Sequence, residues 1–405
     1  MTAPLSSAPE RVAMYEPAFA SDPHATYRRM REQHGPFVPV ELAPGVPATL
    51  VIGYHQALRI LNDPVRFPAD PRQWQQTVPA TCPVLPMLEW RPNALRSSGT
   101  EHTRYREANV AAIDAVDGHH LRAVVEDIAD AAIAAFRHAG RADLLGEYAW
   151  PVAFNALNKA LGCPEDTGHR IADGMAKIFD GVNAAAGNDI LVRAISDLIA
   201  LRRRQPGDDI TSRLLAHPAR LSDTEMLHQL VTLYGAGIEP LTNLIVNSCL
   251  VLLTNPEYSA NLHAGSASVR EALDYVLHRD SPLANYCVSY PPHPVEIDGF
   301  VFPAHEPVVI SMAGCNNDPA LGPDPGAAGS RAHLSWSTGP HACPARTPAY
   351  IIAETALTHL LDALPEVELA GQPGELTYRP GPFHRALTSL PVVFPTPTTV
   401  EGVSA

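Results

Sequence analysis

The sequence predicts a mainly α-helical fold with small β-sheets, and two observations support this class. Apolar residues recur at helical spacing in six segments between residues 101 and 253. Strand-like runs occur only before residue 53 and after residue 285. With 405 residues, 46% of them hydrophobic and 18% charged, the chain can bury one large core or two ordinary domains.

The N-terminal part predicts a short amphipathic helix, His24–His34, before two strands, Phe37–Val40 and Thr49–Ile52. A helix over His55–Leu61 follows, so we expect a small sheet region at about residues 36–53. The helical body then covers about residues 101–282. Its predicted helices are Glu101–Ile113, His119–His138, Trp150–Leu161, His169–Val182, Asp189–Arg203 and Ser222–Leu253.

The longest helix begins at Ser222, because Glu225 three residues later completes a capping box. Its apolar stretch, Leu230–Leu253, is long enough to suggest a membrane span, but Glu239 and Pro240 interrupt it. A buried central helix is the better interpretation. Strands return in a C-terminal sheet region that also carries a cysteine loop, at about residues 283–395. These strands are Tyr286–Tyr290, Val295–Phe302, Val308–Ser311 and Pro391–Phe394.

The charge and the cysteines restrict the class of partner. A net charge of -14 argues against nucleic acid or an anionic membrane surface, which both require a basic field, and a neutral or mildly polar small molecule fits better. The six cysteines have no metal-ligand spacing, and no cleavable leader opens the chain. We expect a cytoplasmic protein with no membrane insertion.

One cysteine stands in a distinctive loop, Ser335-Trp-Ser-Thr-Gly-Pro-His-Ala-Cys343-Pro-Ala. Gly339 and Pro340 hold the loop open, and helical spacing resumes over Thr347–Leu361. The sulfur of Cys343 is therefore expected near a helix N-terminus, where partial positive charge stabilises a thiolate. A buried structural cysteine is the alternative, and it is the default for the other five.

This loop resembles the axial-cysteine loop of the cytochrome P-450 family, with Trp336, Gly339, His341 and Cys343 in the matching places and Ser337 replacing a glycine. The order of elements resembles that family from end to end. The resemblance implies a single P-450 domain over residues 1–405, with a triangular helical body and the haem between the long central helix and the cysteine loop. Further matches are Glu101-His-Thr-Arg-Tyr-Arg106, Ala149-Trp-Pro151, Gly207-Asp-Asp209 and Ala236-Gly-Ile-Glu239.

The resemblance also implies the roles of individual residues. Cys343 would be the thiolate ligand of haem b, an arrangement that favours O–O cleavage. His102, Arg106 and His341 would bind the haem propionates, although a solvated helix face is an equally common setting for the first two. The other predicted haem-binding residues are Ala236, Gly237, Trp336, Gly339 and Ala345.

The chain departs from the family pattern at three places. The long helix keeps the acid, Glu239, but has Pro240 where the family usually has a proton-delivering alcohol, and we expect a kink there. Pro344 follows the cysteine, so one N–H that normally donates to the sulfur is missing. The buried Glu-x-x-Arg pair and its partner are absent. Tyr275 and His278 replace the pair, Leu321–Arg331 lacks the usual partner arginine, and Ser289 stands where a third propionate-binding arginine is usual.

Three segments are expected to form the substrate pocket: the loop Trp74–Leu95, the long helix, and Leu283–Tyr286. Aromatic residues in such a loop serve packing as often as recognition. The predicted pocket residues are Trp74, Met87, Trp90, Leu233, Tyr234 and Leu283.

The function that the resemblance implies is a haem-thiolate monooxygenase with Glu239 and Pro240 at its catalytic position. It would oxidise a small molecule of secondary metabolism, using O2 and electrons from a ferredoxin and ferredoxin reductase, since no flavin or dinucleotide segment is present. A peroxide-using peroxygenase is one alternative, because relatives of that kind also have proline there. Fatty acids are disfavoured as its substrates, because Glu239 would repel them. A haem-binding accessory protein with little turnover is the other alternative.

Overall fold

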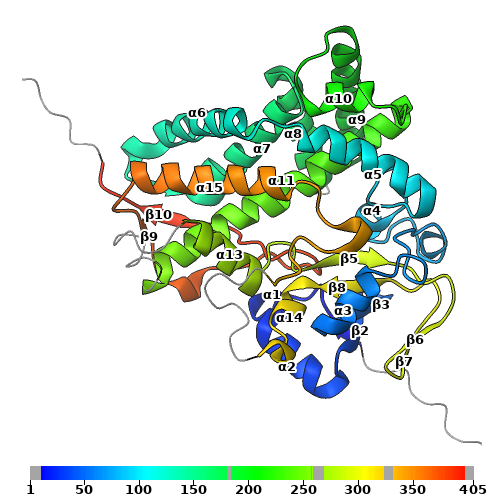
Figure 1. Cartoon of the computed structure of the whole chain (residues 1–405). Coiled ribbons are helices and arrows are strands. Elements are labelled where there is room, and N and C mark those ends of the chain that lie inside the picture. Colours follow the sequence, from blue (N-terminus) through cyan, green and yellow to red (C-terminus); the bar gives the residue numbers. More distant parts are fainter. Residues whose placement is uncertain (1–10, 180–183, 257, 259–268, 323–331, 397–405) are drawn as a thin grey trace, which may run out of the picture. The chain divides into compact units, whose positions relative to one another are not determined.

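A computed structural model of the chain describes residues 11–179, 184–256, 258, 269–322 and 332–396. The chain divides into two compact units. Unit 1 comprises residues 1–103, 277–343 and 378–385, and unit 2 comprises residues 104–276, 344–377 and 386–405. The predicted class is confirmed, because long helices dominate and the sheets are small (Figure 1).

Unit 1 is built on a five-stranded sheet in the order β1-β2-β3-β8-β5. β2 and β3 form an antiparallel hairpin, β8 lies parallel to β3, and β5 lies antiparallel to β8. The strands are β1 (Val12–Ala13), β2 (Phe37–Ala43), β3 (Val46–Val51), β5 (Asn285–Ser289) and β8 (Val308–Ser311).

The expectation of separate N-terminal and C-terminal sheets was therefore wrong, because the strands from both regions join in one sheet. All four residues of β8 are buried, and a buried strand satisfies its backbone amides and carbonyls only with a neighbour on each side. A second difference concerns Val295–Phe302, which is a hairpin of β6 (Val295–Ile297) and β7 (Phe300–Phe302). Asp298 and Gly299 form its turn with φ of 52° and 81°, as Asp-Gly turns commonly do.

The helices of unit 1 are short. The predicted N-terminal helices are confirmed as α2 (Pro23–His34) and α3 (Tyr54–Leu61). α2 begins at a proline that follows the N-cap Asp22, whose carboxylate accepts the Ala25 amide at 2.9 Å. The others are α1 (Pro17–Ser21), α4 (Leu85–Leu88) and α14 (Met312–Asn316).

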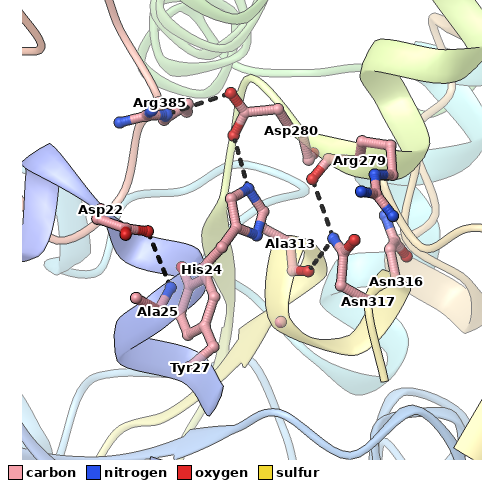
Figure 2. A network of polar contacts seen from close by, with 12 residues as sticks. Asp22, His24, Ala25, Tyr27, Arg279, Asp280, Ala313, Asn316, Asn317 and Arg385 are labelled. Carbon is pink, nitrogen blue, oxygen red and sulfur yellow. Dashed lines mark hydrogen bonds and ion pairs between the residues drawn. The ribbon is translucent and has the colours of Figure 1, made fainter. Parts of the chain in front are cut away.

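A polar cluster joins three segments of unit 1 that are remote in sequence, as Figure 2 shows. Asp280 lies 3.3 Å from His24 on α2, and it accepts a hydrogen bond from Arg385 at 3.2 Å. Burial would raise the pKa of Asp280, but the hydrogen bond to His24 and the charge of Arg385 hold it below the usual value. The cluster therefore ties α2 to the two later segments of the unit through a carboxylate.

Unit 2 is a layered set of long helices. α6 packs against α15 and α7, and α11 contacts α7, α9 and α15 (Figure 1). Most of α5 and most of α13 belong to this unit. The helices are α5 (Gly99–Asp114), α6 (Gly118–Phe136), α7 (Trp150–Ala160), α8 (Glu165–Phe179), α9 (Ala184–Arg204), α10 (Ile210–Ala216), α11 (Asp223–Thr254), α13 (Val269–Arg279) and α15 (Arg346–Ala363).

Most helix predictions in this region are confirmed to within a few residues. The predicted helix over residues 169–182 begins earlier, at Glu165, and its last three residues lie outside the described residues. A π-helical turn, Leu144–Ala149, precedes α7. The sequence missed two of the three strands in the small sheet β4-β10-β9, because strands of two or three residues are too short to show an alternating pattern. These are β4 (Arg141–Asp143), β10 (Pro391–Val393) and β9 (Glu368–Leu369).

α11 begins as predicted, with both hydrogen bonds of the capping box between Ser222 and Glu225. The helix then continues through Pro240 to Thr254. By length and composition α11 could cross a membrane, but 61% of its most apolar window is buried, as in the core helix of a globular protein. Glu225 also pairs with Arg104 and accepts the Tyr105 hydroxyl at 2.8 Å, which fixes the start of α11 against α5.

Candidate active site

Cys343 ends a tight loop in unit 1. The loop turns at Ser337 and Gly339, both with positive φ, and one 3-10 turn covers Gly339–His341. The Cys343 amide donates to the Trp336 carbonyl at 2.8 Å, which closes the loop, and the residue is half-buried. α15 begins three residues later, as the sequence predicts. The chain thus presents a thiol on a fixed backbone just before a long helix.

Gly339 is required by its surroundings. Its φ is +71°, and a Cβ atom there would overlap the carbonyl oxygen of Leu61 at the end of α3. Any side chain would therefore push the loop away from α3.

The start of the loop is anchored by a buried, neutral network. Asn316 is 0% exposed, and its amide donates to the Leu277 carbonyl at 3.1 Å and to the Ser335 hydroxyl at 3.0 Å. Its side-chain oxygen accepts the Leu334 amide at 2.7 Å. His278 follows Leu277 and is buried edge-to-face against His333, with ring centroids 6.3 Å apart. Hydrogen bonds without formal charge therefore hold the loop next to the position where the family usually has an arginine.

The structure brings two of the predicted propionate-binding residues together. His102 is 7% exposed, His341 is half-buried, and their ring centroids lie 4.1 Å apart within unit 1. Arg106 lies one turn further along α5 and belongs to unit 2, where it is half-buried. Ala345, also in unit 2, is the N-cap residue of α15 and packs against the apolar cluster of α9 and α11.

The residues of unit 1 fit a haem with a thiolate ligand. Ser289 is 7% exposed, and its hydroxyl has no hydrogen-bond partner within the described part of the chain. A buried donor of this kind is costly unless a ligand completes it, and a propionate carboxylate would do so. Ser289, His102, His341 and the thiol of Cys343 are the residues of unit 1 whose chemistry would suit a cofactor that carries carboxylates and iron.

Two residues near the loop were missed by the sequence reasoning. Cys287 has a φ of 47° where the register of β5 and β8 shifts. Burial raises the pKa of its thiol to about 11, and the groups that act on it include the Ser337 hydroxyl, Cys343 and Arg96. No sequence pattern marks Cys287. Arg96 is one of two arginines, with Arg91, in the short loop before α5, and nothing in the sequence distinguishes it from a solvated residue.

In unit 2, α11 carries the predicted catalytic position. Asn243 donates to the Glu239 carboxylate at 3.2 Å, and Glu239 and Pro240 are half-buried. The Thr242 hydroxyl is buried and makes no hydrogen bond among the described residues. Ala236 is exposed on the same helix. A Cβ at Gly237 would come within 3.0 Å of a Leu157 methyl group, which indicates close packing there.

The six predicted pocket residues lie in different settings. In unit 1, Trp74 is 3% exposed and packs on Tyr290, whereas Met87 is 36% exposed and Trp90 is half-buried under the Arg72 guanidinium. Leu283 packs against two apolar clusters of the same unit. In unit 2, Leu233 is half-buried on α11. Tyr234 is 1% exposed and donates to the Asn158 side chain at 2.8 Å.

A comparison with protein-family models found no match. Among curated proteins, the chain is 32% identical over 387 residues to the cytochrome P-450 monooxygenase PikC of Streptomyces venezuelae, covering 92% of this chain and 91% of the relative. The chain belongs to the cytochrome P-450 family. This P-450 is also 28% identical to cytochrome P-450 107B1 of Saccharopolyspora erythraea, over 93% of this chain and 96% of that one.

Solved structures confirm the P-450 fold. Testosterone-bound CYP154C4 from Streptomyces sp. superposes with a TM-score of 0.87 at 26% identity, over 96% of this P-450 and 99% of that chain. The complex of P-450 BioI with an acylated acyl carrier protein has a TM-score of 0.81 at 24% identity, over 93% and 100%. Family membership implies a haem with a cysteine thiolate ligand.

Proposed function

We propose that this P-450 is a monooxygenase that oxidises a small organic molecule of secondary metabolism with O2 and electrons from a separate ferredoxin-type donor. The observation that carries the proposal is the loop of Cys343, whose backbone is closed by the Trp336 carbonyl and anchored by Asn316. A thiol held in this way can serve as an iron ligand without rearrangement of the chain. Relatives named as hydroxylases, such as 6-deoxyerythronolide B hydroxylase, support the reaction class.

In this proposal each residue has a defined task. Haem b would supply the activation of O2, and Cys343 would be the thiolate that holds its iron. His102, His341 and Arg106 hold the propionates, and Ser289 adds a neutral hydrogen bond where the family usually has a cation. The remaining haem contacts are Ala236, Gly237, Trp336, Gly339 and Ala345. We further propose that residues 1–405 act as one cytoplasmic domain.

We infer that proton delivery in this chain departs from the family pattern. Pro240 has neither a hydroxyl nor an N–H, so residue 240 cannot pass a proton as the alcohol usual in the family does. The Asn243 amide holds one carboxylate oxygen of Glu239. A water molecule or a substrate hydroxyl would then carry the proton from this carboxylate. The absence of the alcohol is also the observation that favours peroxide as an alternative oxidant.

The first test is the absorption spectrum of the dithionite-reduced protein with carbon monoxide. We expect the strongly red-shifted Soret band of a thiolate-ligated haem. Cys343→Ser should abolish that band, whereas Cys163→Ser, at a buried cysteine of unit 2, should leave it unchanged. An unshifted band in the wild type would contradict the assignment of Cys343.

A second test identifies the oxidant. Product formation is compared with a ferredoxin, its reductase and NADPH, and separately with hydrogen peroxide. Pro240→Thr, which restores the hydroxyl, should increase the fraction of reducing equivalents that appears in product. If only peroxide supports turnover, the protein is a peroxygenase. If a thiolate haem is bound and neither oxidant supports turnover across a broad substrate panel, the accessory role is the better description.

A further inference from the structure

Arg96 is a buried cation in the loop that precedes α5. It is 5% exposed, although arginine is among the residues most seldom buried. The side chain of Asn93 fixes the local backbone by accepting the amides of Leu95 and Arg96 at 3.0 and 2.9 Å. The Ser97 hydroxyl donates to the Asn93 carbonyl at 2.6 Å. Three local hydrogen bonds therefore hold the backbone turn that carries Arg96.

Among the described residues of unit 1, the guanidinium makes neutral contacts. One nitrogen, Nη2, donates to the Met87 carbonyl and to the Tyr286 hydroxyl, and the guanidinium carbon lies 5.3 Å from the centroid of the Tyr286 ring. No aspartate or glutamate oxygen lies within 4.0 Å of Arg96 among the described residues. A guanidinium carries five N–H groups on three nitrogens, so two nitrogens remain for a further acceptor.

The other shielded arginines of unit 1 show what is usual in this protein. Each has a carboxylate within 4.0 Å, and their side chains are 25% exposed or less. The pairs are Arg11–Glu306 at 3.2 Å, Arg31–Asp318 at 3.8 Å and Arg385–Asp280 at 3.2 Å. Arg96 is better buried and lacks such a partner. Because a buried charge is costly without a counter-ion, the arrangement indicates an external anion.

Arg96 is joined to the strand that carries Cys287. Its guanidinium donates to the hydroxyl of Tyr286, the residue before Cys287 on β5. Burial raises the pKa of Cys287, while the Ser337 hydroxyl of the cysteine loop and the charge of Arg96 lower it. Asp70, which acts with Arg96 on the pKa of Tyr290, already pairs with Arg72.

We propose that Arg96 binds the carboxylate of an acidic substrate. The inference rests on the proposed function and assigns its substrate class. It replaces the neutral substrate expected from the net charge and from Glu239, because the sequence does not show that Arg96 is a buried cation. The planar guanidinium matches a carboxylate in two-point geometry, which lysine cannot provide. Both partners of Arg96, Met87 and Tyr286, belong to segments expected to line the substrate side. A haem propionate is the other possible source of a carboxylate. The position expected to face a propionate is that of Ser289, whose hydroxyl makes no hydrogen bond among the described residues, so we assign the propionate to Ser289 and not to Arg96.

The test uses ω-(imidazol-1-yl)alkanoates of increasing chain length and the matched ω-(imidazol-1-yl)alkanols. The imidazole binds haem iron, so the Soret shift gives a Kd for each probe, and calorimetry gives a second Kd that does not depend on the spectrum. At the best chain length we expect the acid to bind roughly 10- to 100-fold more tightly than the alcohol, as for a hydrogen-bonded charge pair. Arg96→Gln should reduce this ratio to about one, and Arg96→Lys should retain part of it.

The control is Arg91→Gln in the same loop, because Arg91 already pairs with Glu89. This variant should keep the full preference for acids. The proposal is overturned if no chain length favours the acid in the wild type, or if Arg96→Gln keeps the preference. If Arg96→Gln does not fold, the partial preference of Arg96→Lys decides.

Two further measurements separate the possible failures. Haem content and the rate of haem transfer to apomyoglobin are measured for each variant. If Arg96→Gln loses haem while its haem-loaded fraction keeps the preference for acids, Arg96 holds a propionate and the substrate assignment is wrong. If the wild type shows no thiolate haem with carbon monoxide, the proposed function fails. Calorimetry with the same acids and alcohols then still tests Arg96.

Discussion

Replacing Gly339 by alanine tests whether the cysteine loop depends on close contact with α3. Two terms add at this position. A residue with a Cβ at φ +71° costs about 1–2 kcal/mol, and forcing an atom against well-packed neighbours costs about 1–3 kcal/mol more. The second term is at its upper end here, because the overlapped atom is the backbone oxygen of Leu61 and not a flexible side chain. We therefore expect Gly339→Ala to destabilise unit 1 by about 4–5 kcal/mol.

The assay combines haem content, the carbon monoxide spectrum and the apparent Tm. Gly339→Ala should bind less haem and show a weakened red-shifted band, because the loop must move away from α3. Gly45→Ala is the matched control, since Gly45 has φ +72° and nothing within 4 Å of a Cβ, so it carries only the backbone term. If the two variants have the same spectrum, haem content and Tm, the close approach to Leu61 does not position the thiol.

Three further predictions follow from charges and from a missing donor. Glu225→Gln should lower stability by about 2 kcal/mol at pH 7. Burial raises the pKa of half-buried Glu225, but the hydrogen bonds from Arg104, Ser222 and Tyr105 outweigh it and lower the pKa to about 2, and solvent at the partly exposed Arg104 screens some of that effect. Since the folded pKa is depressed, the difference from wild type should shrink as the pH falls from about 4.5 toward 2, and denaturation midpoints that stay equally far apart would contradict it. Pro344→Leu adds an N–H beside the sulfur and should raise the haem midpoint potential in a redox titration; an unchanged potential would rule out a role for the missing donor. Asp280→Asn should destabilise the protein by about 1–2 kcal/mol at neutral pH, measured by thermal denaturation. At a pH low enough to protonate Asp280 in the wild type, the two proteins should be equally stable.

Much of the helical body could be predicted because its signals are local. The start of α11 depended on Ser222 and Glu225, which are three residues apart, and both hydrogen bonds of the capping box are present. The position of Cys343 before α15 was similarly local, since it followed from Gly339, Pro340 and the helical spacing that resumes after them.

Features that depend on long-range packing could not be predicted. The pairing of β3 with β8 joins residues more than 250 positions apart, and no pattern in either strand specifies the other. The three hydrogen bonds of Asn316 were also unpredictable, because an asparagine looks the same in a sequence whether its side chain is solvated or holds a loop. The burial of Arg96 is a further example, since arginine in a loop normally indicates solvent exposure.

The parallel pair β3–β8 constrains the order in which the protein can mature. Residue 49 leaves the ribosome long before its partner, residue 308, so the central sheet has a high contact order. Until β8 is synthesised, the hairpin of β2 and β3 has an unpaired edge. The cysteine loop follows β8 in the chain and is anchored to α14, which begins directly after that strand. Stable capture of haem is thus expected late in biosynthesis, and expression at lower temperature with added haem precursor should increase the loaded fraction.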